Sequence, residues 1–284
     1  MRLVNFRYKG RVEFGLERDG YIRSLAAASY QSDVEFFNGG DDAMAAAREL
    51  LDAPNAEQIP LSEVQLLAPV LKPGKILCVG LNYRDHAIES KMAIPEVPTI
   101  FLKLPNAVTG PGADIILPRN SSQPDYEAEF AAVIGRGGRN IRVEDWERHV
   151  LGYTILNDVS ARDIQLATSQ WTLGKSFDTF APMGPAIVTK DEIRDPHALD
   201  IRLSINGEVL QHSNTKHLIF KLPELIAYIS AVVPLEAGDV ISTGTPAGVG
   251  LGRTPPRWLK PGEEIVITVE GIGELRNHTV AAGS

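Results

Sequence analysis

The sequence is poor in the residues that mark several common protein classes. It has one cysteine, Cys78, which excludes an internal disulfide bond and fits a reducing compartment. Acidic residues outnumber basic ones by 36 to 28, and the net charge of −8 leaves no positive field to attract nucleic acid or an anionic membrane. The longest apolar stretch, near 225–235, is far too short to span a bilayer and contains Pro234. The N-terminal segment lacks the apolar core of a signal peptide, so we expect a cytoplasmic protein.

The rest of the composition is typical of a globular protein. Hydrophobic residues make up 44% of the chain and charged residues 23%. Its 284 residues could form one large domain, or a main domain with a small appendage. Strand patterns outnumber helix patterns, and short turns join most neighbouring strands. This organisation predicts a mixed, strand-rich α+β fold rather than a doubly wound parallel sheet.

The first 71 residues are predicted to form a small module. Short strands are expected over Arg2–Tyr8 and Arg11–Leu16, and a helix over Asp41–Leu51, whose first turn is acidic. The proline-flanked segment 60–69 is irregular and is the best candidate for a linker. We therefore expect a division into residues 1–71 and 72–284. The first part carries no chemical motif that we can identify, and we expect it to have a structural or dimer-contact role.

Two glutamates on an apolar strand are the strongest sign of chemistry. Glu127 and Glu129 open the run Glu127–Ile134, and side chains two apart on a strand share a face. Neighbouring carboxylates on such a strand repel each other and lose hydration, and a divalent cation would relieve both costs. Asp158, at the end of the apolar strand Leu151–Asp158, is the candidate third ligand. The alternative, which spacing alone leaves open, is that Glu127 and Glu129 form the solvated face of an edge strand.

Three further polar residues lie in segments with unusual features. His86 and Glu89 fall on one face of a short helix that Asn82 could cap, in a polar segment before Pro95 that would be weakly held, as a mobile lid would be. Lys175 lies in a loop rich in aromatic residues, where it could be desolvated and aimed inward. The plainer alternatives are a surface histidine paired with Glu89, and a lysine that covers the rings while its charge stays in water.

A glycine-rich loop follows a buried strand near the C-terminus. The segment Thr243–Gly250 could bring backbone N–H groups to an anion. It is not a Walker loop, because no Gly-Lys-Ser/Thr follows and no helix pattern opens there.

Taken in order, these segments resemble the fumarylacetoacetate hydrolase family. The resemblance covers roughly residues 72–284 and rests on seven motifs in register: Gly80–His86, Phe101–Lys103, Asp125–Glu129, Gly152-Tyr153 with Asn157–Asp163, Lys175–Asp178, Asn206–Glu208 and Thr243–Gly250. It implies a β-roll catalytic domain over residues 72–284, preceded by a small N-terminal α/β domain, and a homodimer. It also implies one divalent cation per subunit, Mg²⁺ or Mn²⁺, held by Glu127, Glu129 and Asp158.

The resemblance also implies a substrate and roles for individual residues. Family substrates are small diketo or β-keto acids, such as acylpyruvates, that are cleaved at a carbon–carbon bond. The metal would act as a Lewis acid, and Lys175 would add positive charge where the metal-bound enolate develops. His86, oriented by Glu89, would activate the water that attacks the distal carbonyl. The residues implied to hold the substrate carboxylate or the oxyanion are Arg162, Gln165 and Thr245.

The sequence leaves several functions open. Hydrolysis of an acylpyruvate or a related 2,4-diketo acid is the leading hypothesis, and decarboxylation of oxaloacetate is its nearest rival, because both reactions pass through an enolate. The His86–Glu89 pair favours the hydrolase, which needs a base for water. Leu81 stands where some acylpyruvate-cleaving members have arginine, which predicts a less charged distal end of the site. A family isomerase or hydratase and a catalytically silent metal-binding protein are the remaining alternatives.

Overall fold

Both faces of strand β11 (Ala128–Ile134) are buried, and the fold is built around this strand. Phe130 and Ala132 point into a core that includes residues of a second sheet, whereas Ala131 and Val133 belong to a core shared with the N-terminal residues. The computed structural model describes residues 1–89 and 93–283. The end of the expected lid, residues 90–92, therefore lies outside the described residues.

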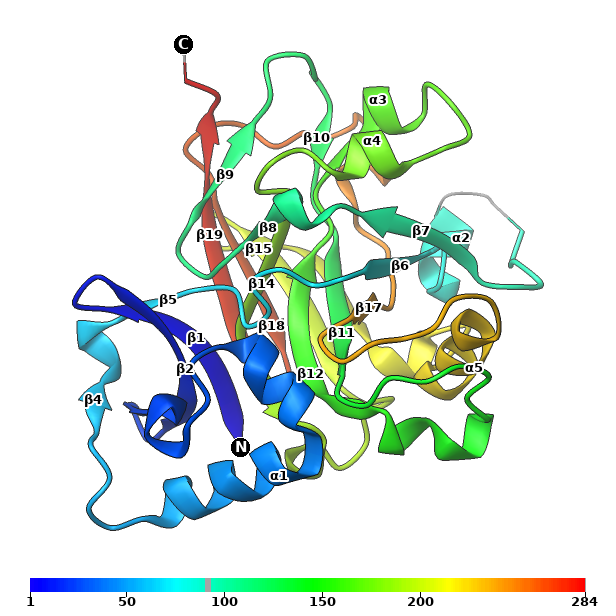
Figure 1. Cartoon of the computed structure of the whole chain (residues 1–284). Coiled ribbons are helices and arrows are strands. Elements are labelled where there is room, and N and C mark those ends of the chain that lie inside the picture. Colours follow the sequence, from blue (N-terminus) through cyan, green and yellow to red (C-terminus); the bar gives the residue numbers. More distant parts are fainter. Residues whose placement is uncertain (90–92, 284) are drawn as a thin grey trace.

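Two sheets contribute to the main core (Figure 1). In spatial order the larger sheet contains β4 (Ile59–Pro60), β3 (Tyr21–Ser24), β2 (Arg11–Arg18), β1 (Arg2–Tyr8), β14 (Ala181–Thr189), β12 (Val150–Asn157), β11, β17 (Val240–Ser242), β6 (Ile76–Gly80) and β7 (Thr99–Lys103), with β5 (Gln65–Leu66) beside β1 and β8 (Val108–Thr109) beside β14. The second sheet contains β16 (Glu208–Asn214), β15 (Asp200–Ile205), β18 (Glu264–Val269), β19 (Gly273–Ala281) and β9 (Asp114–Leu117). A short ladder joins β10 (Pro124–Asp125) to β13 (Ser160–Ala161). The predicted strand-rich α+β fold is confirmed.

Helices are few and mostly short. The α-helices are α1 (Asp33–Asp52), α2 (Arg84–Glu89), α3 (Arg162–Gln165), α4 (Thr172–Lys175) and α5 (Leu222–Val232). The 3₁₀ turns are η1 (Leu25–Ala28), η2 (Leu61–Glu63), η3 (Pro105–Ala107), η4 (Val143–Arg148), η5 (Lys190–Glu192), η6 (Thr215–His217) and η7 (Gly250–Gly252). In the described part of the chain, no helix is both long enough and apolar enough to cross a membrane.

The N-terminal residues extend the larger sheet instead of forming a sheet of their own. Strand β1 pairs with β14, and α1 packs against this part of the molecule (Figure 1). Helix α1 bends at Gly40, whose φ of 53° lies outside the helical range, so its second half starts at the predicted Asp41. The first half was not predicted, although serine is a common residue at the N-terminal cap of a helix. The Ser32 side chain caps this helix by accepting a hydrogen bond from the Glu35 N–H at 3.2 Å. A domain boundary at residue 71 stays a prediction.

Candidate active site

Three buried carboxylates meet at the ends of two neighbouring strands. Strands β11 and β12 are antiparallel, and Ala128 lies opposite Asn157, which brings Glu127 and Glu129 beside Asp158. One oxygen from each of these three side chains, which we call the carboxylate cluster, lies within 4.8 Å of the other two. Their relative exposures are 5%, 1% and 0% respectively, so the interpretation as a solvated edge-strand face is wrong.

Three cations surround two members of the cluster. Lys175 Nζ lies 2.8 Å from both Glu127 Oε2 and Asp158 Oδ2. Lys103 Nζ lies 2.6 Å from Asp158 Oδ1, and Arg162 Nη2 lies 2.6 Å from Glu127 Oε1. Burial alone would raise the pKa of Glu127, but the Lys175 and Arg162 charges outweigh it and lower that pKa to about 2. Burial opposes the charge on Lys175, yet Asp158 and Glu127 raise its pKa.

The third member, Glu129, has polar partners but no ion pair among the described residues. Its Oε2 accepts hydrogen bonds from the Ser242 hydroxyl and from the Gly244 N–H, the latter at 3.0 Å. Burial, followed by the nearby Asp158 and Glu127 carboxylates, raises the pKa of Glu129 well above its usual range. The cluster therefore lacks positive charge at Glu129. A hard divalent cation with oxygen ligands fits this donor set.

The carboxylate cluster borders a cavity of about 470 Å³, a size that suits a small acid. Glu127 and Glu129 line it directly. The predicted catalytic and substrate-binding residues that line it are His86, Glu89, Lys175, Arg162, Gln165 and Thr245. Its apolar wall includes Leu81, Leu166, Trp171 and Leu251. The structure thus brings all the predicted side chains to one place, while their individual roles stay predictions.

His86 and Glu89 form a pair on the short helix α2. His86 Nδ1 lies 3.4 Å from Glu89 Oε2, so the expected pair forms, and the two side chains are only 14% and 21% exposed. The Glu89 carboxylate also accepts hydrogen bonds from the Gly248 N–H, at 3.0 and 3.1 Å. Glu89 therefore orients the His86 ring and also links α2 to the glycine-rich loop.

This contact is expected to depend on pH. Burial would raise the pKa of Glu89, but hydrogen bonds from His86 and Gly248 outweigh it and lower that pKa. A carboxyl group whose pKa is lowered by folding stabilises the protein above its unfolded pKa, and the stabilisation is lost as the pH falls through the folded pKa. We expect Glu89→Gln to lower the melting temperature near neutral pH. The difference from the wild type should begin to shrink below about pH 4 and disappear as the pH falls through the lowered folded pKa.

Thermal unfolding from about pH 7 down to about pH 3 measures this difference. The matched control is Glu96→Gln, which removes an exposed carboxylate outside the cavity and should leave the melting temperature unchanged throughout. A difference for Glu89→Gln that stays constant with pH would contradict the expectation.

The glycine-rich loop is held by carboxylates of the protein itself. Asp125 accepts hydrogen bonds from the Gly250 N–H at 2.7 Å and the Leu251 N–H at 3.0 Å, and its Oδ2 lies 2.8 Å from Arg162 Nε. The loop N–H groups that were expected to meet an external anion therefore include several that already bond to Asp125 or Glu89. Through Arg162, Asp125 links the loop to the carboxylate cluster.

The predicted substrate-binding residues also make internal bonds. Arg162 Nη1 donates to Gln165 Oε1 at 2.9 Å, in addition to its contacts with Asp125 and Glu127. The Thr245 hydroxyl oxygen accepts from Gln211 Nε2 at 2.8 Å. These bonds fix the side chains in position at the cavity wall. Whether they bind substrate stays a prediction.

Sequence reasoning missed several residues of the site. Lys103 was quoted within a family motif but given no role, although a lysine that ends the apolar strand β7 was a visible signal. Asp125 and Arg253 were also unassigned. Arg253 lines the cavity and is held by the Tyr126 hydroxyl at 3.2 Å and the Leu210 carbonyl at 2.9 Å. Nothing local in the sequence shows that Asp125 and Arg253 belong to the site.

Comparisons with known proteins agree with this arrangement. The family model described as Fumarylacetoacetate (FAA) hydrolase C-terminal matches residues 75–280. Oxaloacetate tautomerase FAHD2A, mitochondrial, of Bos taurus is 47% identical over 289 residues, which cover 99% of this chain and 92% of that protein. Oxaloacetate tautomerase YisK of Bacillus subtilis (strain 168) is 48% identical over 256 residues, which cover 86% of this chain and 85% of that protein.

Two solved structures share the fold over the full length of both chains. A putative HpcE protein from Mycobacterium smegmatis has a TM-score of 0.90 at 39% identity, with 100% of each chain covered. Maleylpyruvate hydrolase from Sphingobium sp. SYK-6, in complex with manganese (II) ion and pyruvate, has a TM-score of 0.84 at 31% identity, again with 100% of each chain covered. The family fold, with its small N-terminal domain, is confirmed, and the carboxylate cluster is consistent with a divalent metal. The chain is an enzyme of the fumarylacetoacetate hydrolase family.

Proposed function

We propose that this enzyme interconverts the keto and enol forms of oxaloacetate, or of a closely similar 2-oxo dicarboxylic acid. The observation that carries the proposal is the meeting of the carboxylate cluster, Lys175 and the His86–Glu89 pair at one cavity. Two relatives that match most of the chain are named oxaloacetate tautomerases, which supports this substrate. The sequence-based preference for hydrolysis becomes the second candidate.

The charge balance at the base of the cavity favours a divalent cation. With Glu129 ionised, as binding of a cation requires, the carboxylate cluster and Asp125 supply four negative charges, against the three positive charges of Lys103, Lys175 and Arg162. Mg²⁺ or Mn²⁺ held by the carboxylate cluster would change this surplus from negative to positive, and the site would then attract an anionic 2-oxo acid. When bound, the cation polarises the keto group and makes the neighbouring carbon more acidic.

Tautomerisation moves one proton between carbon 3 and the oxygen on carbon 2. We propose that His86, which lines the cavity, removes the proton from carbon 3. Glu89 orients the His86 ring through Nδ1, which leaves Nε2 to face the substrate. Lys175 keeps a positive charge near the oxygen, where negative charge develops when carbon 3 loses its proton. The protonated His86 then gives this proton to the oxygen on carbon 2, directly or through a water molecule, which completes the enol and leaves the protein unchanged. In the reverse direction the proton returns from that oxygen to carbon 3 by the same route.

The second carboxylate of oxaloacetate also has a candidate partner. Arg253 lines the cavity and places a permanent positive charge in its wall. The absence of arginine at Leu81 predicted a less charged distal end. We instead assign the second carboxylate to Arg253, which lines the same cavity directly after η7. A dicarboxylic substrate fits this arrangement better than an acylpyruvate with an apolar acyl group.

Hydrolysis remains a second candidate because of one observation. The His86–Glu89 pair could activate water as well as carry a proton at carbon, and a structural relative is named maleylpyruvate hydrolase. Decarboxylation of oxaloacetate would use Lys175 and the cation in the same way, without a need for His86. The homodimer and the cytoplasmic location stay predictions; the Bos taurus relative carries the word mitochondrial in its name.

One panel of assays separates these functions. The Mn²⁺-loaded protein is first mixed with oxaloacetate. Keto–enol relaxation is followed by ultraviolet absorbance, and pyruvate release is measured separately. Cleavage of acetylpyruvate is then measured in a third assay. We expect enzyme-catalysed relaxation to be the fastest of the three reactions. His86→Gln should slow it by about 10²-fold or more, because a positioned acid–base group is lost. The matched control is His217→Gln, which changes an exposed histidine on η6 outside the cavity.

Each of the other possible results would assign a different activity to the enzyme. Faster cleavage of acetylpyruvate, lost in His86→Gln, would establish the hydrolase and refute the tautomerase. Pyruvate release that is fastest and insensitive to His86→Gln would establish the decarboxylase. Equal effects of the two histidine substitutions would refute the role assigned to His86.

A further inference from the structure

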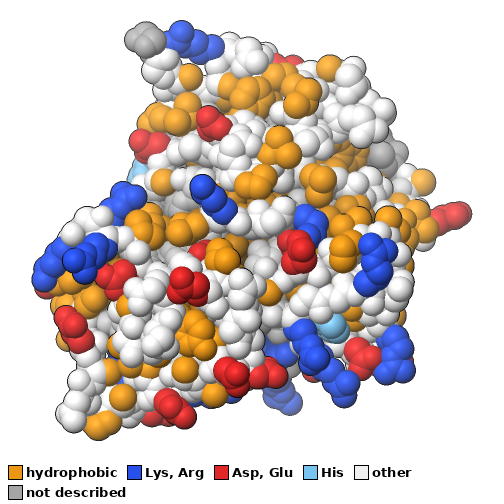
Figure 2. All heavy atoms as spheres, viewed as in Figure 1, with side chains coloured by type: hydrophobic (Ala, Val, Ile, Leu, Met, Phe, Trp, Pro, Cys, Tyr) orange, Lys and Arg blue, Asp and Glu red, His pale blue; other side chains and the backbone are white. Residues whose placement is uncertain are grey.

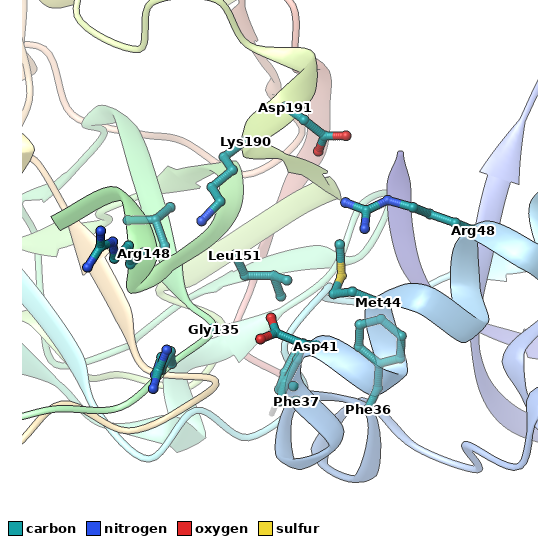
Figure 3. Close-up of a pocket in the computed structure, with 13 residues that line it drawn as sticks. Phe36, Phe37, Asp41, Met44, Arg48, Gly135, Arg148, Leu151, Lys190 and Asp191 are labelled. Carbon is teal, nitrogen blue, oxygen red and sulfur yellow. The ribbon is translucent and has the colours of Figure 1, made fainter. Parts of the chain in front are cut away.

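A second cavity lies between helix α1 and the start of β12, and none of its lining residues lines the active-site cavity. Its volume is about 580 Å³, larger than that of the active site. Figure 3 shows Asp41 and Met44 of α1 on one side of it, with Leu151 and Lys190 on the other. We call it the α1 cavity.

The inner wall of the α1 cavity is apolar. Phe36, Phe37, Met44, Val150 and Leu151 line it. Gly135, at the end of β11, also lines the wall, and a Cβ there would lie 2.9 Å from Leu151 Cβ, so a larger residue would push into the leucine. A wall of aromatic and aliphatic side chains suits an apolar group of a ligand.

The rim of the cavity is basic, in a chain whose net charge is −8. The cationic side chains that line it are Arg48, Arg136, Arg148 and Lys190. Only two lining carboxylates, Asp41 and Asp191, oppose them, which leaves two positive charges in excess. Figure 2 shows Lys and Arg side chains gathered at the lower right of the face it displays, with Asp and Glu side chains along the bottom edge to their left. The rim is therefore positively charged, although the protein as a whole is negatively charged.

Part of this positive charge has no partner in the protein. Arg148 pairs with Asp145 at 3.2 Å. By contrast, within residues 1–89 and 93–283, neither Arg48 nor Arg136 has a carboxylate oxygen within 4.0 Å. Lys190 Nζ donates to the main-chain carbonyl of Glu147, and partial burial of the ammonium group lowers the pKa of Lys190 even though nearby carboxylates favour its charge. An anion in the cavity would satisfy these groups.

We propose that the α1 cavity is a binding site for a small organic anion that carries an apolar group, such as an aryl-substituted carboxylic acid. The apolar wall would take the ring, and Arg48, Arg136 and Lys190 would hold the carboxylate. The excess of positive charge disfavours a cationic ligand. The Asp41 and Asp191 carboxylates disfavour a polyanion such as a nucleoside triphosphate, because like charges would face each other across a narrow space.

Phenylacetate is the test probe, and phenylacetamide, of the same shape without the charge, is its control. Both are titrated calorimetrically into the full-length, Mn²⁺-loaded protein. We expect phenylacetate to bind once per chain and phenylacetamide at least about tenfold more weakly. The double variant Arg48→Gln/Lys190→Gln should weaken phenylacetate binding by at least about tenfold, since charge-assisted hydrogen bonds are lost. Met44→Trp should block it by filling the apolar wall.

A matched double variant serves as the control for the loss of positive charge. Lys9→Gln/Arg11→Gln also removes two exposed positive charges, neither of which lines the α1 cavity, and should leave binding unchanged. Arg48 and Lys190 are exposed, so their substitution is compatible with folding even if Met44→Trp is not. No binding to the wild type, equal loss in the two double variants, or loss only in Lys175→Met at the active site would each overturn the proposal.

Discussion

Replacing Glu129 with glutamine is expected to abolish binding of Mn²⁺ without destabilising the metal-free protein. In the metal-free state the charge on Glu129 is opposed by burial and by two neighbouring carboxylates, and its hydrogen bonds come from Ser242 and Gly244. A glutamine has nearly the same shape and can still accept both bonds, while it removes the repulsion. It also removes one of the anionic ligands that a hard cation requires.

The measurement is thermal unfolding with and without Mn²⁺. A cation at about a hundredfold excess over its dissociation constant stabilises the wild type by about 2.7 kcal/mol, which raises the melting temperature by roughly 5 °C for a chain of this size. We expect Glu129→Gln to melt at or above the wild-type temperature without metal and to gain nothing from Mn²⁺. Glu208→Gln, at an exposed position on β16, is the control and should keep the full gain. An equal gain in Glu129→Gln would show that the cation binds elsewhere.

Replacing Lys175 with methionine is expected to reduce kcat by about 10²- to 10³-fold while Mn²⁺ stays bound. Lys175 is 2% exposed, lines the cavity, and keeps its charge because Asp158 and Glu127 raise its pKa. The Lys175 charge would stabilise the transition state most, because the substrate oxygen becomes negative there. The substitution should therefore lower kcat more than it weakens substrate binding. Steady-state kinetics at saturating Mn²⁺ separates kcat from KM.

Lys103→Met is the matched comparison for Lys175→Met. Lys103 has a similar buried charge and bonds Asp158 at 2.6 Å, but it does not line the cavity. We expect it to weaken Mn²⁺ binding by about 10- to 100-fold, because it positions a ligand, and to change kcat at saturating metal much less. Equal kcat losses in the two variants would mean that Lys175 also acts only by positioning the carboxylate cluster.

Features that depend on neighbours in sequence could be predicted well. The Asn206-Gly207 pair is typical of a two-residue hairpin turn, and these residues have φ values of 51° and 84° between β15 and β16. The two-residue spacing of Glu127 and Glu129 placed them on one face, and the antiparallel pairing of β11 with β12 then brought Asp158 to them. Local rules were sufficient here because a strand fixes where alternate side chains point.

Features that depend on distant partners could not be predicted in the same way. Asn82 was expected to cap α2, but it is buried, and its Nδ2 donates to the carbonyls of Phe220 at 2.9 Å and Thr243 at 2.8 Å. Asp125 bonds the Gly250 N–H, a partner far away in the sequence. Lys175 was expected in a loop and ends the short helix α4 instead. These placements follow from tertiary packing, which competes successfully with local propensity in short segments.

The choice of reaction was the hardest inference for a physical reason. Hydrolysis, decarboxylation and tautomerisation all need positive charge beside an oxygen that becomes negative, so the carboxylate cluster and Lys175 do not distinguish them. The groups that do distinguish them are His86, which can serve either water or carbon, and Arg253, which favours a second carboxylate on the substrate. Arg253 reaches the cavity only through the folded loop after η7.

The most direct test of the account is a titration of Mn²⁺ into the metal-stripped protein while the keto–enol relaxation of oxaloacetate is recorded. The account predicts that the wild-type rate rises and saturates at one Mn²⁺ per chain, and that the rate of Glu129→Gln stays at its metal-free value. A wild-type rate that is independent of Mn²⁺, or the same saturation curve in Glu129→Gln, would contradict the claim that the carboxylate cluster holds the catalytic cation.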